Sequence, residues 1–274
     1  MNLQVLVATM NQNDYSLLDR MKINSDTIIS NQCNSMDYSE MEYHGNRIQM
    51  ISTKTIGVGL NRNIGLMFSN ADILLFADDD IVYKAGYEKE IIDEFKKNKK
   101  ADGIFFRFKF IRDGKVYDIN HKKRGVKRGR IYNTLGYGTY NLAVKREFLQ
   151  KNNIKFSELF GGGSVYGSGE DSLLILDLLR NGAKLYISDI IIGDNYKDKS
   201  SWFTGYNKKY FFDNGAFIKC AFPHSGWLIK WYYIFAFSKI SELNIIERKH
   251  CIKAGMRAFL SLRRYSDEAV DSFK

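Results

Sequence analysis

Short apolar runs alternate with helical patterns along the first hundred residues of this chain. Runs of about four to eight apolar residues are typical of buried strands, while apolar residues with helical spacing indicate a helix packed on one face. Strands that alternate with helices are typical of βαβ units around a largely parallel sheet. The expected strands are Leu3–Ala8, Ile28-Ile29 and Ile73–Ala77, and the expected helices are Gly59–Phe68 and Tyr87–Lys97.

The pattern after residue 100 predicts that antiparallel pairs join this sheet. Ile104–Phe110 is expected to form a strand, and Asp113-Gly114 after it is a typical hairpin turn. Further expected elements are a strand over Tyr140–Val144, helices over Lys145–Lys151 and Ser172–Arg180, a helix C-cap at Asn181-Gly182 and a strand over Lys184–Ile192. We therefore expect an α/β fold with a central mixed, mostly parallel sheet.

The charge of the chain indicates an anionic partner. Its 274 residues include 41 Lys and Arg against 31 Asp and Glu, which gives a formal net charge of +10. Nucleic acid, anionic lipid and phosphorylated substrates all fit this charge. The hydrophobic content of 45% is enough for a sizeable core, so the chain is expected to be globular.

The cysteines and the apolar segments bear on the location of the protein. Cys33, Cys220 and Cys251 have no CxxC or Cys/His spacing, so neither a zinc site nor a disulfide framework is indicated. The start of the chain has no basic region and too short an apolar run for a signal peptide. No segment approaches the ~18 uninterrupted apolar residues of a spanning helix. We expect a cytoplasmic protein.

Three consecutive carboxylates, Asp78, Asp79 and Asp80, directly follow the apolar run Ile73–Ala77. Ligands of open α/β sheets bind at the carboxyl ends of strands, so this charge is expected at a binding edge. Carboxylate oxygens select hard cations that stay partly hydrated and also bind substrate phosphates. The pattern therefore indicates a Mn²⁺ or Mg²⁺ site, with a solvated acidic turn as the alternative.

A second pair of carboxylates, Glu170 and Asp171, comes directly before the helix expected over Ser172–Arg180. The glycine-rich run Phe160–Ser164 precedes this pair. Acidic residues in a first helical turn commonly complement the helix dipole, which is a purely structural explanation. A carboxylate held there can also act as a general base, and glycines let an acceptor approach the backbone closely.

Glycines also surround the start of the helix expected over Gly59–Phe68, in the run Gly57–Gly65. A helix N-terminus beside glycines suits phosphate binding, although the spacing is not that of a dinucleotide-binding motif. Arg62 in this run is either a charged contact for a nucleotide or an ordinary surface arginine.

Taken jointly, these stretches resemble family-2-type glycosyltransferases of the GT-A fold, in particular bacterial enzymes that build capsular and other surface polysaccharides. The resemblance covers about residues 3 to 215 and includes Arg62-Asn63-Ile64-Gly65, Asp78–Asp80 and Glu170-Asp171. It implies that a metal-dependent enzyme transfers a sugar from a nucleotide-sugar donor, commonly a UDP-sugar, to a hydroxyl of a lipid-linked glycan acceptor. Inversion at the anomeric carbon would follow from a single in-line displacement.

The resemblance also implies a role for each site residue. Asp171 would be the base that deprotonates the acceptor hydroxyl, with Glu170 beside it. Asp80 would be the main metal ligand, and Asp78 a ribose or water-mediated metal contact. The other implied contacts are Thr9, Asn11, Asn34, Arg62, Asp78 and Asp79 for the donor nucleotide, and Gly161, Gly162 and Trp202 for the acceptor.

The sequence departs from the family pattern in two places. The acidic residues that usually follow the second strand are replaced by Asn31–Ser35, and no clear metal-binding histidine follows the Glu170-Asp171 element. His224 is the remaining candidate for such a ligand.

Two other classes of protein remain open at this stage. Asp78-x-Asp80 after an apolar strand, with Gly193-Asp194 and Asp198 later, resembles haloacid-dehalogenase-type phosphatases, in which Asp78 would be the phosphorylated nucleophile. The basic run His121–Arg130 suggests a nucleic-acid-binding module, but it contains no recognised nucleic-acid motif. Both alternatives leave Glu170 and Asp171 without a role, so we expect no nucleic-acid partner.

The composition changes near Gly205–Ala221, so we expect a catalytic domain over residues 1–215 and a helical extension over residues 216–274. Trp227–Phe237 is rich in the aromatics that favour a membrane interface, yet is too short to span it. A later stretch places Lys249, Lys253 and Arg257 on one face of a helix that Gly255 weakens. We expect peripheral contact with the cytoplasmic membrane face, with packing on the catalytic domain or on a second subunit as the alternative.

Overall fold

The computed structural model describes residues 1–117, 125–196, 204–237 and 240–267, which belong to two compact units. The first unit comprises Met1–Ile56, Leu60–Phe156 and Leu174–Lys199. The second comprises Gly57–Gly59, Ser157–Leu173 and Ser200–Lys274. The chain passes between the units within helices α2 (Val58–Phe68) and α6 (Glu170–Arg180).

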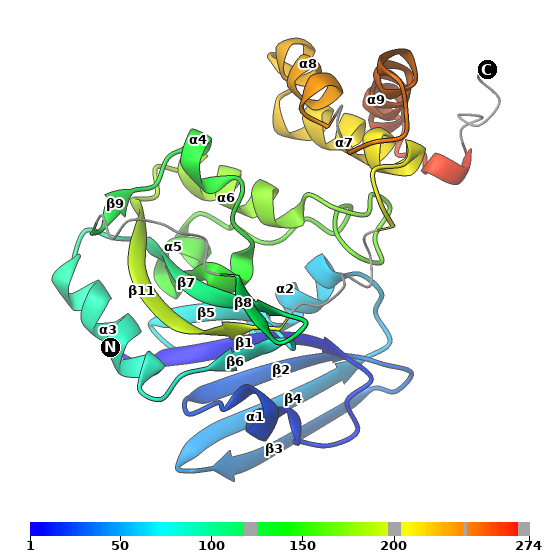
Figure 1. Ribbon diagram of the computed structural model, residues 1–274. Helices are drawn as coiled ribbons and strands as arrows, with labels where there is room; N and C mark the ends of the chain where they lie inside the picture. The colour runs from blue at the N-terminus through cyan, green and yellow to red at the C-terminus, as the bar shows by residue number, and fades with distance from the viewer. Residues whose placement is uncertain (118–124, 197–203, 238–239, 268–274) are drawn as a thin grey trace. The chain divides into compact units, whose positions relative to one another are not determined.

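Eleven strands among the described residues form one mixed sheet in the first unit (Figure 1). Its main order is β3-β4-β2-β1-β5-β10-β7-β11-β6, with β8 paired to β7 and β9 to β11. The strands are β1 (Leu3–Met10), β2 (Asp26–Gln32), β3 (Asp37–Tyr43), β4 (Asn46–Thr53), β5 (Ile73–Asp78), β6 (Ile81–Tyr83), β7 (Gly103–Arg112), β8 (Lys115–Tyr117), β9 (Lys127–Arg128), β10 (Leu142–Lys145) and β11 (Leu185–Asn195). The expected α/β fold with a mixed sheet is confirmed.

Helices and short turns connect these strands. They are α1 (Leu17–Met21), α3 (Tyr87–Lys97), α4 (Ile131–Thr134), α5 (Arg146–Lys151) and the 3₁₀ turn η1 (Thr139–Asn141), together with most of α2 and α6. The expected helix over Tyr87–Lys97 has the bounds of α3. The expected strand over Tyr140–Val144 starts later, because its first residues belong to η1.

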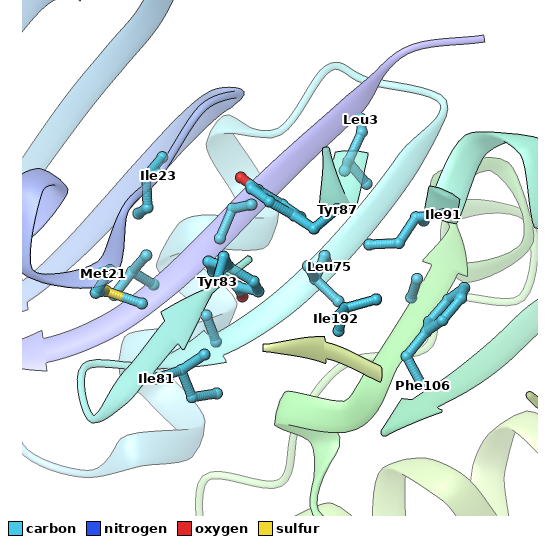
Figure 2. Packing of buried hydrophobic residues seen from close by; sticks show 14 of the residues in the cluster. Leu3, Met21, Ile23, Leu75, Ile81, Tyr83, Tyr87, Ile91, Phe106 and Ile192 are labelled. Atoms are coloured by element: carbon cyan, nitrogen blue, oxygen red, sulfur yellow. The ribbon is translucent and has the colours of Figure 1, made fainter. Parts of the chain in front are cut away.

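Burial on both faces explains the continuous apolar runs of the central strands. Successive side chains of a strand point to opposite faces of the sheet. On β5, Ile73, Leu75 and Ala77 belong to one core cluster, while Leu74 and Phe76 belong to the other. Figure 2 shows part of the first cluster, in which Leu75 and Ile192 lie near the aromatic rings of Tyr83 and Tyr87.

The chain order reverses at strand β1. β2 and β4 lie on one side of β1 and β5 lies on the other, and these four strands are parallel. Ala8 of β1 is in register with Asp78 of β5, and Met10 of β1 is in register with Gln32 of β2. The point where strand order reverses, beyond the carboxyl ends of the strands, is where open α/β sheets bind ligands. The topology therefore directs attention to the residues that follow β1 and β5.

The hairpin that forms one edge of the sheet was not predicted from the sequence. Strands β3 and β4 pair antiparallel through a two-residue turn at His44 and Gly45, with Tyr43 opposite Asn46. Both turn residues have positive φ angles, 50° and 76°, as a tight hairpin turn of this type requires. The second hairpin, at Asp113-Gly114, was expected and is confirmed by the pairing of β7 with β8.

Three helices make up about half of the described residues of the second unit (Figure 1). They are α7 (Lys208–Ala221), α8 (Gly226–Ala236) and α9 (Ile245–Leu260), followed by the 3₁₀ turn η2 (Tyr265–Asp267). Gly255 of α9 has no room for a Cβ because the backbone carbonyl of Phe212 lies against it, so this glycine lets α9 approach α7 closely. The expected boundary between residues 215 and 216 falls inside α7. The division into a catalytic domain and a membrane-associating extension stays a prediction.

Two stacked tyrosines in the first unit differ in how their hydroxyls are satisfied. The rings of Tyr83 and Tyr87 lie 4.2 Å apart and both side chains are buried. The Tyr87 hydroxyl shares a hydrogen bond of 2.7 Å with the hydroxyl of Ser25. The Tyr83 hydroxyl has no hydrogen-bond partner among the described residues. Burial raises the pKa of Tyr87 to about 12 and the pKa of Tyr83 well above its ordinary value, so both stay neutral at physiological pH.

We expect Tyr83→Phe to raise the free energy of unfolding by about 1–2 kcal/mol, because it removes a buried hydroxyl that forms no hydrogen bond. Tyr87→Phe should instead lower it by about 1 kcal/mol, since Ser25 loses its partner. Urea denaturation followed by circular dichroism measures both variants. Equal destabilisation by the two changes would contradict the inference that only the Tyr87 hydroxyl forms a hydrogen bond.

Candidate functional site

The carboxylates that follow β5 are held by groups from β1 and α2. The buried Thr9, near the end of β1, donates its hydroxyl proton to Oδ2 of Asp79 at 2.6 Å. Gln12 in turn donates from Nε2 to the Thr9 hydroxyl oxygen at 3.0 Å. A chain of hydrogen bonds thus fixes Asp79 at the point where the strand order reverses, 70 residues away from Thr9 in the sequence.

Arg62 of α2 forms an ion pair with Asp78. Its Nη2 lies 2.7 Å from Asp78 Oδ1, and the two side chains are only 5% and 23% exposed. The guanidinium group also lies over the ring of Phe156, 5.2 Å from the ring centroid. Arg62 is therefore a buried partner of Asp78 and not a surface arginine. Its direct contact with a donor nucleotide stays a prediction.

The neighbours of Arg62 fix helix α2 against the sheet. Asn61 donates from Nδ2 to the carbonyl oxygens of Thr9 at 3.1 Å and Ser30 at 2.9 Å. Asn63 forms two hydrogen bonds with the backbone of Phe156, at 2.8 and 3.0 Å. A Cβ on Gly65 would lie 2.9 Å from the Ser30 hydroxyl, so only glycine allows this close approach to β2. These contacts explain in structural terms why Arg62, Asn63 and Gly65 occur in the Arg62–Gly65 element.

Asp79 and Asp80 form the tight turn between β5 and β6. The backbone N–H of Tyr196, just after β11, donates to the carbonyl oxygen of Asp80 at 3.1 Å and so ties the turn to another strand. Within the described ranges, no three His, Cys, Asp or Glu side chains come together as a metal cage would require. The coordination shell of any cation bound here would have to be completed by ligands from substrate or solvent.

The second unit contains the glycine-rich loop and the carboxylates at the start of α6. The Val58 N–H donates to the carbonyl oxygen of Gly162 at 2.9 Å, and the N–H of Gly161 donates to the carbonyl oxygen of Tyr166 at 2.9 Å. Gly161 has a φ angle of +106°, and a Cβ there would lie 2.8 Å from the carboxyl carbon of Glu170. The loop therefore folds back on Glu170, and its glycine is needed for that approach.

Gly169, directly before Glu170, is also constrained. Its φ angle is +118°, and a Cβ there would lie 2.8 Å from the ring of Phe217 in α7. The Gly169 carbonyl oxygen accepts the backbone N–H of Leu173 at 2.9 Å and so closes the first turn of α6. This places Glu170 and Asp171 in the first helical turn, where the helix dipole stabilises negative charge.

Asp213 of α7 is a residue of this loop region that the sequence analysis missed. It is buried, and its Oδ2 accepts the backbone N–H of Gly167 at 2.9 Å and forms an ion pair with Lys209. Burial raises the pKa of Asp213, while the Lys209 and Gly167 hydrogen bonds act in the opposite direction. The (i, i+4) spacing of Lys209 and Asp213 on a helix was the available signal, but only the fold shows that Asp213 also holds the loop.

The remaining expected site residues are more scattered. Asn11 directly follows β1 with a φ angle of 54°, and its N–H donates to the carbonyl oxygen of Gln32 at 3.0 Å. Asn34 is exposed in the turn between β2 and β3, and His224 is exposed between α7 and α8. Trp202 lies outside the described residues. The first unit thus brings together Thr9, Arg62, Asp78 and Asp79, and the second brings together Gly161 and Glu170.

The first unit is a mixed α/β sheet whose strand order reverses at β1, beside the carboxylates that follow β5. The chain belongs to glycosyl transferase family 2, because the sequence model of that family matches residues 16–153, about half of the chain. The matched segment includes Arg62 and Asp78–Asp80 and ends before Glu170. No match was found among curated proteins.

Solved structures support the fold. The chain is similar to S. aureus TarS 1-349, with 14% identity and a TM-score of 0.59 over 95% of this chain and 72% of that one. For the TarS 1-349 complex with UDP-GlcNAc the TM-score is 0.60, with 14% identity over 100% of this chain and 76% of that one. The chain covers 46% of a longer TarS structure. At this level of identity the likeness establishes a shared fold.

We expect Gly169→Ala to destabilise the protein more than Gly205→Ala. Both glycines belong to the second unit and have positive φ angles, +118° and +104°, so each change carries a backbone cost of about 1–2 kcal/mol. A Cβ at Gly205 meets open space, whereas one at Gly169 meets Phe217 and adds about 1–3 kcal/mol of overpacking. Urea unfolding curves compare the variants, and equal losses would show that the loop does not press on α7.

Proposed function

We propose that this glycosyltransferase transfers a sugar from a UDP-sugar to a hydroxyl of a lipid-linked glycan acceptor in surface polysaccharide synthesis. The observation that carries the donor assignment is the pairing of Asp79 with Thr9 and of Asp78 with Arg62 where the strand order reverses. Membership of glycosyl transferase family 2 supports the reaction class. The crystal structures of TarS with UDP-GlcNAc and with UDP support a uridine nucleotide as the donor group.

The carboxylates fit a Mg²⁺ or Mn²⁺ ion that is shared with a substrate diphosphate. Mg²⁺ is usually bound through one or two carboxylates together with substrate phosphates and water, so a cage of three carboxylates is not required. Asp80, with Asp78 beside it, would hold the ion, while Asp79 stays hydrogen-bonded to Thr9. When bound, the ion would stabilise the charge of the leaving diphosphate as a Lewis acid.

Asp171 is the proposed general base. It would take the proton of the acceptor hydroxyl while that oxygen forms a bond to the anomeric carbon and the bond to the nucleotide diphosphate breaks. Because attack and departure occur on opposite faces of the sugar, the configuration inverts. Gly161 and Gly162 would let the acceptor approach the backbone, and Glu170 would flank the base.

The phosphatase and nucleic-acid alternatives have less support than this proposal. The family match assigns the chain to transferases of sugars, and it includes the Asp78 segment on which the phosphatase alternative rests. Asp78 is also engaged by Arg62, which would lower the nucleophilicity of its carboxylate. Asp198 of the phosphatase motif and residues 121–124 of the basic run lie outside the described residues.

We expect Asp80→Ala to abolish the Mn²⁺-dependent binding of UDP-sugars while the fold stays intact. A panel of UDP-sugars with Mn²⁺ should stabilise the wild-type protein by about 2.7 kcal/mol at a ligand concentration a hundred times Kd. Thermal unfolding with and without the panel measures this effect. Asp93→Ala in α3 is the matched control and should respond as the wild type does. Full donor stabilisation of Asp80→Ala, or a response only to phosphate mimics, would refute the assignment.

We expect Asp171→Asn to keep donor binding and to reduce turnover by ~10²–10⁴, the usual contribution of a general base. Asp177→Asn, in the same helix α6, is the matched control and should turn over within a few-fold of the wild type. Sugar transfer to an acceptor glycan, measured at saturating donor, gives both rates. If Asp171→Asn turned over at a rate near that of the control, Asp171 would not be the base, and Glu170 or another group would have to act as the base.

A further inference from the structure

Helix α8 of the second unit has an exposed face of large apolar side chains. These residues follow the spacing i, i+1, i+4, i+5 and i+8, which places them on one side of the helix. They are Trp227, Leu228, Trp231, Tyr232 and Phe235, which are 38–66% exposed. We call this surface the aromatic face of α8. Contiguous exposed apolar surface of this kind is uncommon on soluble proteins and usually marks an interaction site.

The aromatic face is not the side by which α8 joins the second unit. Gly226 and Ile234 of the helix are buried. Phe237, directly after the helix, stacks on Tyr206 and has its ring 5.5 Å from that of Tyr210 in α7. Because α8 already has this apolar attachment, folding of the unit does not account for the second apolar side.

Two lysines lie beside Trp231 of the aromatic face. The ammonium groups of Lys230 and Lys249 lie 5.4 and 5.7 Å from the ring centroid of Trp231. Helix α8 contains no acidic residue. Between residues 204 and 267 the sequence has 11 Lys and Arg against 4 Asp and Glu, a formal charge of +7 out of +10 for the whole chain. The charge of the protein is thus concentrated in the segment that carries the exposed aromatics.

We propose that the aromatic face of α8 binds an anionic lipid surface. Tryptophan and tyrosine favour the membrane interface, and lysines beside them attract anionic headgroups. Among the described residues, no helix combines the length and the apolar character needed to cross a membrane. Helix α8 would therefore lie in the plane of the interface, as basic amphipathic helices do.

The positive charge favours a lipid surface over a second copy of this chain. If two copies joined through this face, Lys230 and Lys249 of both chains would approach one another across an apolar contact, which costs free energy. Anionic headgroups instead neutralise these lysines while the aromatic rings leave water. This binding does not depend on the sugar-transfer chemistry, so it can be tested separately from that proposal.

Flotation of the full chain with phosphatidylcholine vesicles, with and without phosphatidylserine, tests the proposal. We expect binding to the vesicles that contain phosphatidylserine, with a decrease as salt screens the charges. The triple variant Trp227→Ser, Trp231→Ser and Phe235→Ser should lose at least about tenfold in affinity, since three apolar contacts with lipid disappear. Lys230→Glu with Lys249→Glu should remove most of the dependence on phosphatidylserine.

The double variant Met67→Ser and Tyr132→Ser is the matched control, because these exposed apolar residues belong to the first unit. It should bind vesicles as the wild type does, and circular dichroism should show that every variant is folded. The proposal is wrong if the wild-type chain ignores anionic vesicles at low salt, or if the triple variant binds them equally well. A concentration-dependent oligomer that ignores vesicles and that the triple variant abolishes would assign the face to a second copy.

Discussion

The candidate donor site depends on the way in which the carboxylates at the end of β5 are balanced by neighbouring groups. Adjacent carboxylates repel one another, and burial would increase that cost. Arg62 compensates Asp78 with a buried ion pair, and Thr9 holds Asp79 with a hydrogen bond. Breaking such a pair would leave an uncompensated charge, so the position of Arg62 has to be secured. The contacts of Asn61 and Asn63 secure it by fixing helix α2 on the sheet.

A similar logic applies to the second unit, where glycines and one buried carboxylate shape the loop before α6. Gly161 and Gly169 adopt positive φ angles and lie against Glu170 and Phe217, so the backbone approaches its neighbours more closely than an L side chain would permit. Asp213 adds a hydrogen bond to the loop by accepting the backbone N–H of Gly167. The proposed general base, Asp171, would need rigid support of this kind, because misplacement by about 1 Å can reduce a rate by ~10²-fold.

The family model describes the first unit better than the second. The family model covers residues 16–153, which include β2, β4, β5 and the carboxylates of the candidate donor site but not β1 with Thr9. Helices α7, α8 and α9 lie outside that match, and they carry both Asp213 and the aromatic face of α8. Most of the net positive charge also lies in this part of the chain, which the family model does not match.

The sequence by itself determined the elements whose signals are local. Short apolar runs predicted strands β1, β5 and β11, because these strands are largely buried, and apolar residues with helical spacing predicted helices α2 and α3, because each packs on one face. It also placed Asp78–Asp80 at a strand end and Glu170-Asp171 at a helix start. The bulges of β11, the hairpin of β3 and β4 and the extent of η1 were not predicted, since they depend on pairing with other strands. Only the tertiary structure decided that Arg62 is buried against Asp78, that Thr9 holds Asp79 and that Asp213 holds Gly167. These partners are 16, 70 and 46 residues apart, and contacts at such separations are set by the topology of the sheet and helices.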